Sequence, residues 1–306
     1  MKFIVAFDIG GTNIKCGLIN KEGNVFEFAI YKTKEIFSSN YDITNLVKKY
    51  VQQSSIEADR IEGIVLGLPC TLSKDRFSTF SCPNLPWLSA KEFSRTLKLG
   101  STQFPLYIER DTNLAVLGEM WKGAAIGHHT IVGIFVGTGL GCGIVLNGRL
   151  FTGSHGAAAE LGHIPYHVEK AEKCPCGNIN CIELFASGKT LEKALEKAPE
   201  VKLDISEVFL LVEKGDLYWQ SVLNDMLDAL STAAATVVNI IDPEILVLGG
   251  GILSIPRFPL RELIQQIREK LRKPEPANSL IIKTSILAEK AALIGARYLF
   301  NLINLT

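Results

Sequence analysis

Apolar and polar positions follow the same order in two distant parts of the chain. Residues 4–20 form an apolar run, a turn of glycine and threonine, a second apolar run and a polar turn at 21–24, and residues 131–147 repeat this order without a gap. Two apolar runs joined by a short glycine-containing turn are typical of a β-hairpin. A hairpin that opens each half of the chain predicts a duplicated α/β fold, although two unrelated buried hairpins would look similar.

Further apolar runs predict strands at residues 61–68, 106–108, 245–248 and 280–284, with helix-like stretches between them. The clearest helix is the alanine-rich stretch 221–241. It is expected to end before Pro243, because the residue that precedes a proline is disfavoured in the helical region. Strands that alternate with helices predict mixed sheets covered by helices.

Composition narrows the class of protein. The 306 residues, 47% of them hydrophobic, suffice for two domains or one large α/β unit, and Lys plus Arg equals Asp plus Glu at 32 each. The sequence contains no basic run with interleaved aromatic residues, so it does not predict a nucleic-acid partner. The longest apolar stretch, 131–146, is broken by glycines and is shorter than the roughly 18–20 residues of a membrane span. Because Asp8 interrupts any secretory signal and the seven cysteines are odd in number, we expect a cytoplasmic protein.

A cluster of metal-ligand residues follows the second hairpin. One imidazole and three thiols, from His163, Cys174, Cys176 and Cys181, match the ligand set of a closed structural zinc site. The C-x-C-x4-C spacing is tighter than the usual zinc pair, so a redox pair or a loop of free thiols is the alternative. Zinc in this place would fix the backbone between Glu160 and Glu183.

Glycine-rich turns follow three of the predicted strands, at Asp8–Asn13, Gly137–Gly141 and Gly249–Gly251. Glycines let backbone N–H groups approach phosphate oxygens, and the hydroxyl of Thr12 adds a donor. The first two turns occupy equivalent places in the two predicted hairpins, so they could hold a triphosphate from opposite sides. The third would let the chain approach an adenine or a ribose. An ordinary tight turn is the alternative for each turn taken alone.

Together these motifs resemble the ROK family of sugar kinases and repressors. The resemblance rests on D-I-G-G-T at 8–12, P-N-L-P at 83–86, Asp111-x-Asn113, G-T-G-L-G, E-L-G-H, the cysteine cluster with its trailing glutamate, and D-P-E-I-L-V-L-G-G-G at 242–251, in family order from Asp8 to about Gly295. It implies a two-domain actin-like ATPase (ribonuclease H-like) fold with duplicated βββαβα-type lobes and a zinc-binding loop. It further implies ATP with Mg²⁺, structural Zn²⁺ and a homodimer.

The resemblance also assigns roles to individual residues. Asp111 matches the catalytic base that accepts the proton of the sugar 6-hydroxyl, although an aspartate that caps a helix at 114–121 is the bland alternative. The positions that match sugar ligands are Asn84, Arg110, Asp111, Glu160, His163 and Glu183, and His163 could serve zinc and sugar through its two ring nitrogens. The positions that match nucleotide ligands are Asp8, Gly10, Gly11, Thr12, Asn13, Lys15, Gly137, Thr138, Gly139, Gly249, Gly250 and Gly251.

Departures from the family pattern point to a subgroup. Arg110 stands where most members have Asn, while Ala159 and Asn180 replace common glycines. The segment 69–75, the P-N-L-P motif and the Arg110-Asp111 pair look most like bacterial D-allose kinases, which makes D-allose the expected substrate and glucose, mannose or N-acetylmannosamine the alternatives. A sugar-sensing repressor is disfavoured, because it needs a helix-turn-helix before the first phosphate turn.

The same resemblance predicts how the chain divides. We expect residues 1–113 plus about 292–306 to form a smaller lobe with the first phosphate turn and sugar contacts. Residues 114–291 would form a larger lobe with the second phosphate turn, the zinc loop and the adenine site.

Overall fold

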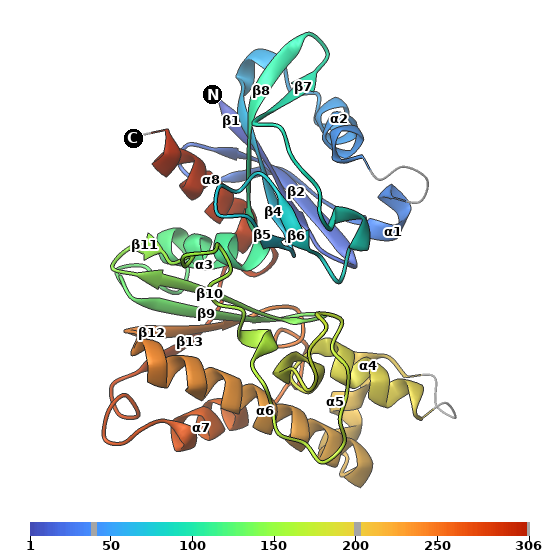
Figure 1. Ribbon diagram of the computed structural model, residues 1–306, viewed down its shortest axis with the longest axis vertical. Helices are drawn as coiled ribbons and strands as arrows, with labels where there is room; N and C mark the ends of the chain where they lie inside the picture. Colours follow the sequence, from blue (N-terminus) through green and yellow to red (C-terminus); the bar gives the residue numbers. More distant parts are fainter. Residues whose placement is uncertain (38–41, 199–202, 305–306) are drawn as a thin grey trace.

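Two lobes, each built on a β-sheet, make up the computed structural model, which describes residues 1–37, 42–198 and 203–304 (Figure 1). The upper sheet has the strand order β3-β2-β1-β4-β8-β7 and the lower sheet the order β11-β10-β9-β12-β13. The upper strands are β1 (Phe3–Ile9), β2 (Asn13–Asn20), β3 (Val25–Lys32), β4 (Ile61–Leu68), β7 (Thr96–Leu99) and β8 (Thr102–Arg110). The lower strands are β9 (Ile131–Val136), β10 (Leu140–Leu146), β11 (Arg149–Leu150), β12 (Ile245–Gly249) and β13 (Ile281–Thr284).

The two sheets repeat one topology. In the upper sheet β1 pairs antiparallel with β2 and parallel with β4, which in turn pairs parallel with β8. In the lower sheet β9 pairs antiparallel with β10 and parallel with β12, which pairs parallel with β13. Both predicted hairpins are confirmed, and so is the duplicated α/β fold. Strand β7 is an addition to the upper sheet that has no lower counterpart.

Most predicted elements exist, with shifted ends. Strand β4 has the predicted bounds, whereas β8 is longer than the predicted 106–108. Helix α6 (Leu217–Ile241) begins four residues early because the Asp216 carboxylate accepts the N–H groups of Tyr218 and Trp219. It ends at Asp242, which adopts a left-handed conformation (φ 51°) before Pro243.

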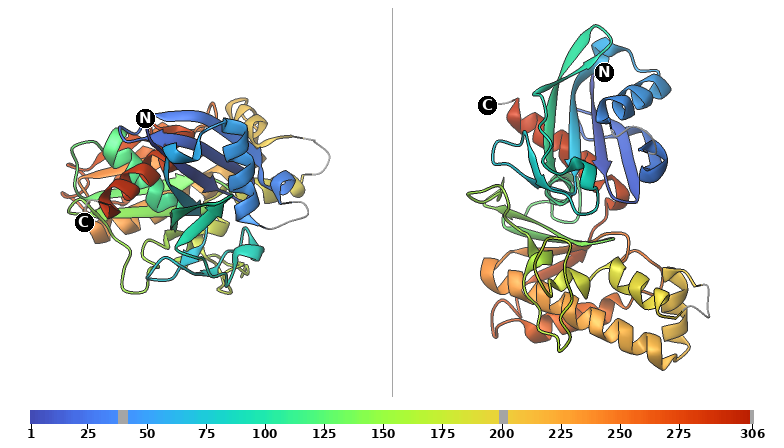
Figure 2. Two further views of the ribbon diagram at one scale, coloured as in Figure 1. Left: turned by 90° about the horizontal axis from the view of Figure 1, so that it is seen from above. Right: turned by 45° about the vertical axis from the view of Figure 1, so that its right-hand side comes forward.

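Helices cover the outer faces of both sheets (Figures 1 and 2). Helix α2 (Ile43–Ser54) packs on the upper sheet, and α6 and α7 (Leu260–Lys270) pack below the lower one. The large apolar cores lie in these layers, between sheet and helices. Further elements are α1 (Thr33–Ile36), the hairpin β5 (Thr71–Leu72) and β6 (Thr79–Ser81), α4 (Gly188–Glu196) and α5 (Ile205–Glu213). No helix in these described segments is long and apolar enough to cross a membrane.

The helix that follows the last parallel strand of each sheet packs on the other sheet. Helix α3 (Asp111–Lys122) follows β8 of the upper sheet, yet Val116 and Leu117 pack with Ile131 and Val145 of the lower one. Helix α8 (Ala291–Ile303) follows β13 of the lower sheet and packs with Ile4, Ala6 and Val65 of the upper one. The two lobes are therefore joined through these crossing helices.

Helices α3 and α8 touch backbone to backbone where they cross. A Cβ atom added to Gly295 would lie 1.7 Å from the carbonyl oxygen of Leu114, and one added to Gly118 would lie 2.1 Å from that of Ala291. The contact is reciprocal, because each glycine faces the carbonyl of the residue four positions before the other glycine. Only glycine fits at such an approach.

The buried carboxylate of Glu119 binds the segment that precedes α8. The Glu119 side chain on α3 is fully buried and accepts hydrogen bonds from Ala124 N (2.7 Å), Ser285 Oγ (2.5 Å) and Leu287 N (3.1 Å). A buried charge is tolerated where its oxygens are satisfied in this way. Glu119 therefore ties α3 to the segment between β13 and α8.

The lobe boundary drawn at 113/114 falls inside α3, and α8 begins at Ala291, one residue before the predicted return to the first lobe. Residues 305–306 of that predicted segment lie outside the described residues. The division into lobes at these residues stays a prediction.

Candidate functional site

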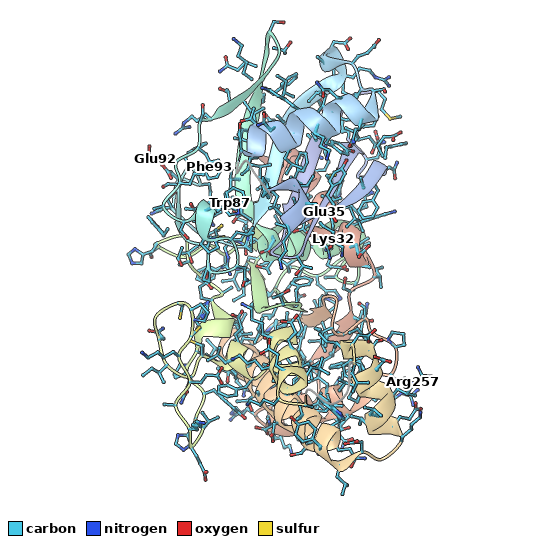
Figure 3. All side chains as sticks on the ribbon, turned by 90° about the vertical axis from the view of Figure 1, so that its right-hand side faces the viewer. Lys32, Glu35, Trp87, Glu92, Phe93 and Arg257 are labelled. Atoms are coloured by element: carbon cyan, nitrogen blue, oxygen red, sulfur yellow. The ribbon has the colours of Figure 1, made fainter. Side chains whose placement is uncertain are left out.

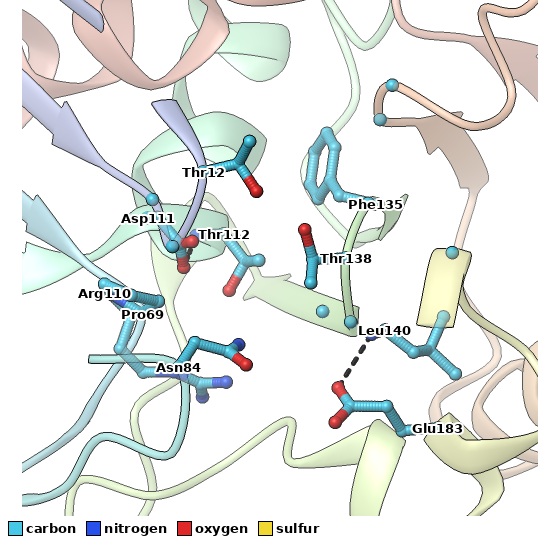
Figure 4. A pocket seen from close by; sticks show the side chains of 18 of the residues that line it. Thr12, Pro69, Asn84, Arg110, Asp111, Thr112, Phe135, Thr138, Leu140 and Glu183 are labelled. Carbon is cyan, nitrogen blue, oxygen red and sulfur yellow. Dashed lines mark hydrogen bonds between the residues drawn. The ribbon is translucent and has the colours of Figure 1, made fainter. Parts of the chain in front are cut away.

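A cavity of about 520 Å³ lies between the lobes and is lined by turns from both sheets. Figure 4 shows Thr12, Asp111 and Asn84 on one side of it, with Thr138 and Glu183 on the other. The lining includes nearly all the predicted nucleotide and sugar residues: Asp8, Gly10, Gly11, Thr12, Asn13, Lys15, Asn84, Arg110, Asp111, Gly137, Thr138, Gly139, Glu160, His163, Glu183, Gly250 and Gly251. Gly249 is the predicted nucleotide residue that the structure places elsewhere, since it packs against Ser285 and Phe135.

The two glycine turns occupy equivalent places but differ in register, since Ile9 pairs with Ile14 in the first hairpin and Val136 with Leu140 in the second. Gly10 N donates to Asn13 O (2.9 Å) at the β1–β2 turn, and Gly137 N donates to Gly139 O (3.0 Å) at the β9–β10 turn. A Cβ atom at Gly137 would meet nothing within 4 Å, so this turn borders open space. At the first turn the Asp8 carboxylate pairs with Lys15 (3.3 Å).

The third glycine turn supports the end of strand β9. Gly250 has φ +99°, and a Cβ atom there would lie 2.3 Å from the carbonyl oxygen of Val136. Gly251 borders open space in the cavity, with nothing within 4 Å of an added Cβ atom. A flat ligand could therefore approach the backbone at Gly251, whereas Gly249 acts in packing.

Asp111 is the first residue of α3, and Arg110 is the N-cap. The Asp111 carboxylate accepts the N–H of the adjacent Thr112 (2.7 Å). Asp111 therefore does not occupy the N-cap position that the alternative interpretation gives it. Burial, and next the nearby Asp8 carboxylate, raise the pKa of Asp111 to about 7. This pKa suits a group that takes up a proton near neutral pH.

Arg110 contacts two residues of the second lobe, Ala158 and Glu160. Its guanidinium donates to Ala158 O (2.6 Å) and pairs with Glu160 (3.4 Å), and the Arg110 residue is only 7% exposed. The other oxygen of Glu160 lies 3.9 Å from Nε2 of His163. Arg110, Glu160 and His163 therefore form one chain of polar contacts along the cavity.

Asn84 comes from a loop that is anchored in the first lobe. Leu85 and Leu88 are buried, and the Trp87 ring packs against Phe37 with centroids 4.4 Å apart (Figure 3 labels Trp87). The Asn84 side chain accepts a hydrogen bond from Lys189 Nζ (2.7 Å). On the opposite side, Glu183 accepts the N–H of Leu140 (2.8 Å) and so ties the end of the cysteine loop to the second glycine turn.

The four predicted zinc ligands come together. Their ligand atoms all lie within 4.8 Å of one another, with Cys174 Sγ to His163 Nδ1 at 3.8 Å and Cys176 Sγ to Cys181 Sγ at 3.5 Å. Ligands at the Zn–S and Zn–N distances of a tetrahedral site are separated by roughly 3.5–3.8 Å. The cluster therefore fits zinc, with Nδ1 of His163 on its side and Nε2 facing Glu160.

The two residues that replace common glycines occupy left-handed backbone positions. Ala159 has φ +64° and Asn180 has φ +55°. Asparagine tolerates this conformation, while alanine costs roughly 1 kcal/mol there. Ala159 thus bears backbone strain directly before Glu160.

Replacing Cys176 by Ser is expected to reduce bound zinc. Zinc content measured by mass spectrometry after dialysis should be about one ion per wild-type chain and well below that in the variant, because serine is a poorer zinc ligand than a thiolate. Cys16→Ala, which removes a buried thiol outside the cluster, should retain the metal. A wild-type chain purified without zinc, or a Cys176→Ser chain that keeps it, would contradict the site.

Two residues that contact the cavity lining could not be predicted from the sequence. Lys189 Nζ donates to Asn84 Oδ1, and Thr33 Oγ1 donates to Gly10 O (2.8 Å) at the first glycine turn. Both contacts join segments far apart in the chain. The available signal was weak: Ser187-Gly188 before Lys189 marks a helix start without showing what the lysine reaches.

Comparison with known proteins identifies the family. The model of the ROK family matches residues 4–302. A glucokinase of Halalkalibacterium halodurans is 30% identical, with 97% of this chain and 94% of the relative covered, and a glucokinase of Thermotoga maritima is 27% identical, with 96% and 95% covered. The crystal structure of a ROK family glucokinase from Streptomyces griseus in complex with glucose and AMPPNP has a TM-score of 0.80 at 25% identity, covering 97% of this chain and 98% of that one. The chain therefore belongs to the ROK family.

Proposed function

We propose that the protein transfers the terminal phosphoryl group of ATP to the 6-hydroxyl of a hexose, with glucose as the first substrate to test. The observation that carries this proposal is that Asp111, two glycine turns and the side chains predicted to bind sugar line one cavity. A volume of about 520 Å³ is in the usual range for small-molecule sites.

The residues divide the reaction between them. Backbone N–H groups of the two turns hold the phosphates, and Asp8 would hold the Mg²⁺ that offsets their charge. Asp111 accepts the proton of the sugar hydroxyl as that oxygen attacks the terminal phosphorus. Asn84, Glu160, His163 and Glu183 hold the remaining hydroxyls, and oriented donors and acceptors of this kind supply much of the rate in phosphoryl transfer.

The identity of the hexose is the finer part of the proposal. The motifs around Arg110 predict D-allose, whereas the relatives described above are glucokinases and support glucose better. The guanidinium of Arg110 lies on Glu160 and the Ala158 carbonyl. Any effect of Arg110 on sugar choice is therefore expected to act through the orientation of Glu160.

A coupled ADP-release assay over glucose, D-allose, mannose, fructose, N-acetylglucosamine and N-acetylmannosamine tests this function. We expect the highest kcat/KM with glucose, and we expect Arg110→Asn to lower it about tenfold or more, because Glu160 loses its charged partner. Arg261→Asn, at an exposed position on α7, is the matched control. A higher kcat/KM with D-allose than with glucose would support the motif-based prediction. Absence of ADP release with every sugar would refute the proposal that the protein is a hexose kinase.

Homodimer formation, which the family resemblance implies, stays a prediction. Light scattering after size exclusion, at several protein concentrations, would show whether the mass is that of one chain or two.

A further inference from the structure

Lys189 bridges the two lobes beside the cavity, whose lining includes its neighbour Gly188 and its partner Asn84. It is the second residue of α4 in the lower lobe, and its Nζ donates to Oδ1 of Asn84 in the upper lobe (2.7 Å). Asn84 in turn adjoins the first glycine turn, because a Cβ atom on Gly11 would lie 3.3 Å from the Asn84 Cβ atom. The ammonium group therefore lies close to the first turn.

The backbone of the same residue adjoins the second glycine turn. Gly188 N donates to Gly137 O (2.8 Å) and Lys189 N approaches Thr138 O at 3.4 Å. Helix α4 thus begins directly on the second turn. The Lys189 side chain therefore extends from the second predicted phosphate turn to Asn84, which adjoins the first.

The charge of Lys189 is not matched by an acidic side chain. Two cations that line the cavity are paired in this way, Lys15 with Asp8 and Arg110 with Glu160. In the described segments no carboxylate oxygen lies within 4.0 Å of Lys189 Nζ, and the partner observed is the neutral amide of Asn84. An ammonium group forms stronger hydrogen bonds to phosphate than to a neutral amide oxygen.

We propose that Lys189 binds the terminal phosphate of the nucleoside triphosphate, exchanging its bond to Asn84 for one to this phosphate, and remains on the group during transfer. This inference rests on the proposed function. In the reaction the bond from the terminal phosphorus to the bridging oxygen breaks, a bond to the sugar oxygen forms, and the hydroxyl proton goes to Asp111. Lys189 keeps its own protons and stabilises the charge on the transferred phosphoryl group.

The exchange has a second effect at Asn84. Once Lys189 has moved to the phosphate, Oδ1 of Asn84 is open to accept a sugar hydroxyl. Binding of the triphosphate and of the hexose would therefore favour each other, whereas a diphosphate, which lacks the terminal group, would leave the Lys189–Asn84 bond in place.

Nucleotide titration of Lys189 variants tests the proposal without turnover. With Mg²⁺ and no sugar, we expect Lys189→Met to weaken ATP binding by about 10- to 30-fold and ADP binding by less than about threefold, measured by calorimetry, since only ATP carries the contacted group. Lys189→Arg keeps the charge and should stay within about threefold of wild type for both nucleotides. Lys197→Met, at an exposed lysine that ends the same helix, should match wild type.

Turnover and sugar binding supply the second readout. Lys189→Met should lower kcat/KM for ATP by about 100-fold in the hexose assay, while Kd for the hexose alone should fall, because Oδ1 of Asn84 is then open to a sugar hydroxyl. Equal losses for ATP and ADP, no loss for either, or weaker hexose binding in Lys189→Met would overturn the proposal. The Lys189–Asn84 bond would then only hold the two lobes together in the absence of ligand. If the wild type released no ADP with any hexose, the proposed function would be refuted. The difference between ATP and ADP binding would still decide the role of Lys189.

Discussion

Replacing Asp111 by Asn is expected to lower kcat about 10³-fold or more with the preferred hexose. Asparagine keeps the shape of the side chain and an oxygen for the Thr112 N–H, but it cannot accept the hydroxyl proton. Coupled ADP release, with nucleotide and sugar affinities measured separately, should show loss of turnover with little loss of binding. A variant that retains a tenth of wild-type kcat would exclude Asp111 as the base.

The same substitution is expected to stabilise the protein above neutral pH. Because the pKa of Asp111 is raised to about 7 in the folded chain, the folded state holds a proton that the unfolded chain loses near pH 4. The free energy of unfolding of the wild type therefore falls as pH rises through this window, and Asn avoids that cost. We expect Asp111→Asn to gain roughly 1–3 kcal/mol at pH 8 and almost nothing at pH 4.

Denaturant unfolding at several pH values checks this result. Asp59→Asn, at an exposed aspartate, should show no such pH-dependent gain. The wild-type kcat/KM should fall about tenfold per pH unit below pH 7, since only the charged carboxylate can accept the proton. A flat rate profile between pH 5 and 8, or a variant less stable than wild type at pH 8, would contradict the role assigned to burial.

Replacing Gly295 by Ala is expected to destabilise the protein severely, by about 4 kcal/mol or more. The new Cβ atom would lie 1.7 Å from the Leu114 carbonyl oxygen, and a backbone atom cannot move aside as the end of a side chain can. Helices α3 and α8 would have to separate, and both sheets depend on them. Urea unfolding, or the soluble yield where no folded protein is obtained, measures the effect.

Two further variants test the reason for this loss. Gly118→Ala meets the reciprocal carbonyl of Ala291 at 2.1 Å and should act in the same direction. Leu302→Ala, at a position on α8 that is 41% exposed, should cost about 1 kcal/mol or less. If Gly295→Ala were as mild as Leu302→Ala, the helices would not pack as tightly in solution as the structure has them.

Local pattern predicts part of this molecule well. The two hairpins and the end of α6 follow from runs of apolar residues, from glycine turns and from Pro243, and these signals act within a few residues. Strand β3 was missed because its side chains are mostly half-exposed or exposed, so apolar and polar positions give no clear stripe. The cluster of predicted zinc ligands can be predicted from the sequence because one imidazole and three thiols are an unusual combination at any spacing.

Contacts between distant segments were beyond the same reasoning. Nothing near Lys189 in the sequence indicates that it reaches Asn84, and nothing near Glu183 indicates that it accepts the N–H of Leu140. The left-handed conformations of Ala159 and Asn180 match the glycines usual at these positions, yet only the backbone reveals them. Such features depend on how the two lobes pack, which local propensity does not encode.

The crossing of α3 and α8 has a consequence for either half of the chain taken alone. A half-length chain with one sheet and one trailing helix would leave much of one sheet face uncovered in this arrangement, because here α3 and α8 pack largely on the sheet of the other half. Two such chains that exchanged helices would restore these contacts, as in a domain-swapped dimer. In the single chain the exchange is intramolecular, so each half depends on the other for the cover of its sheet.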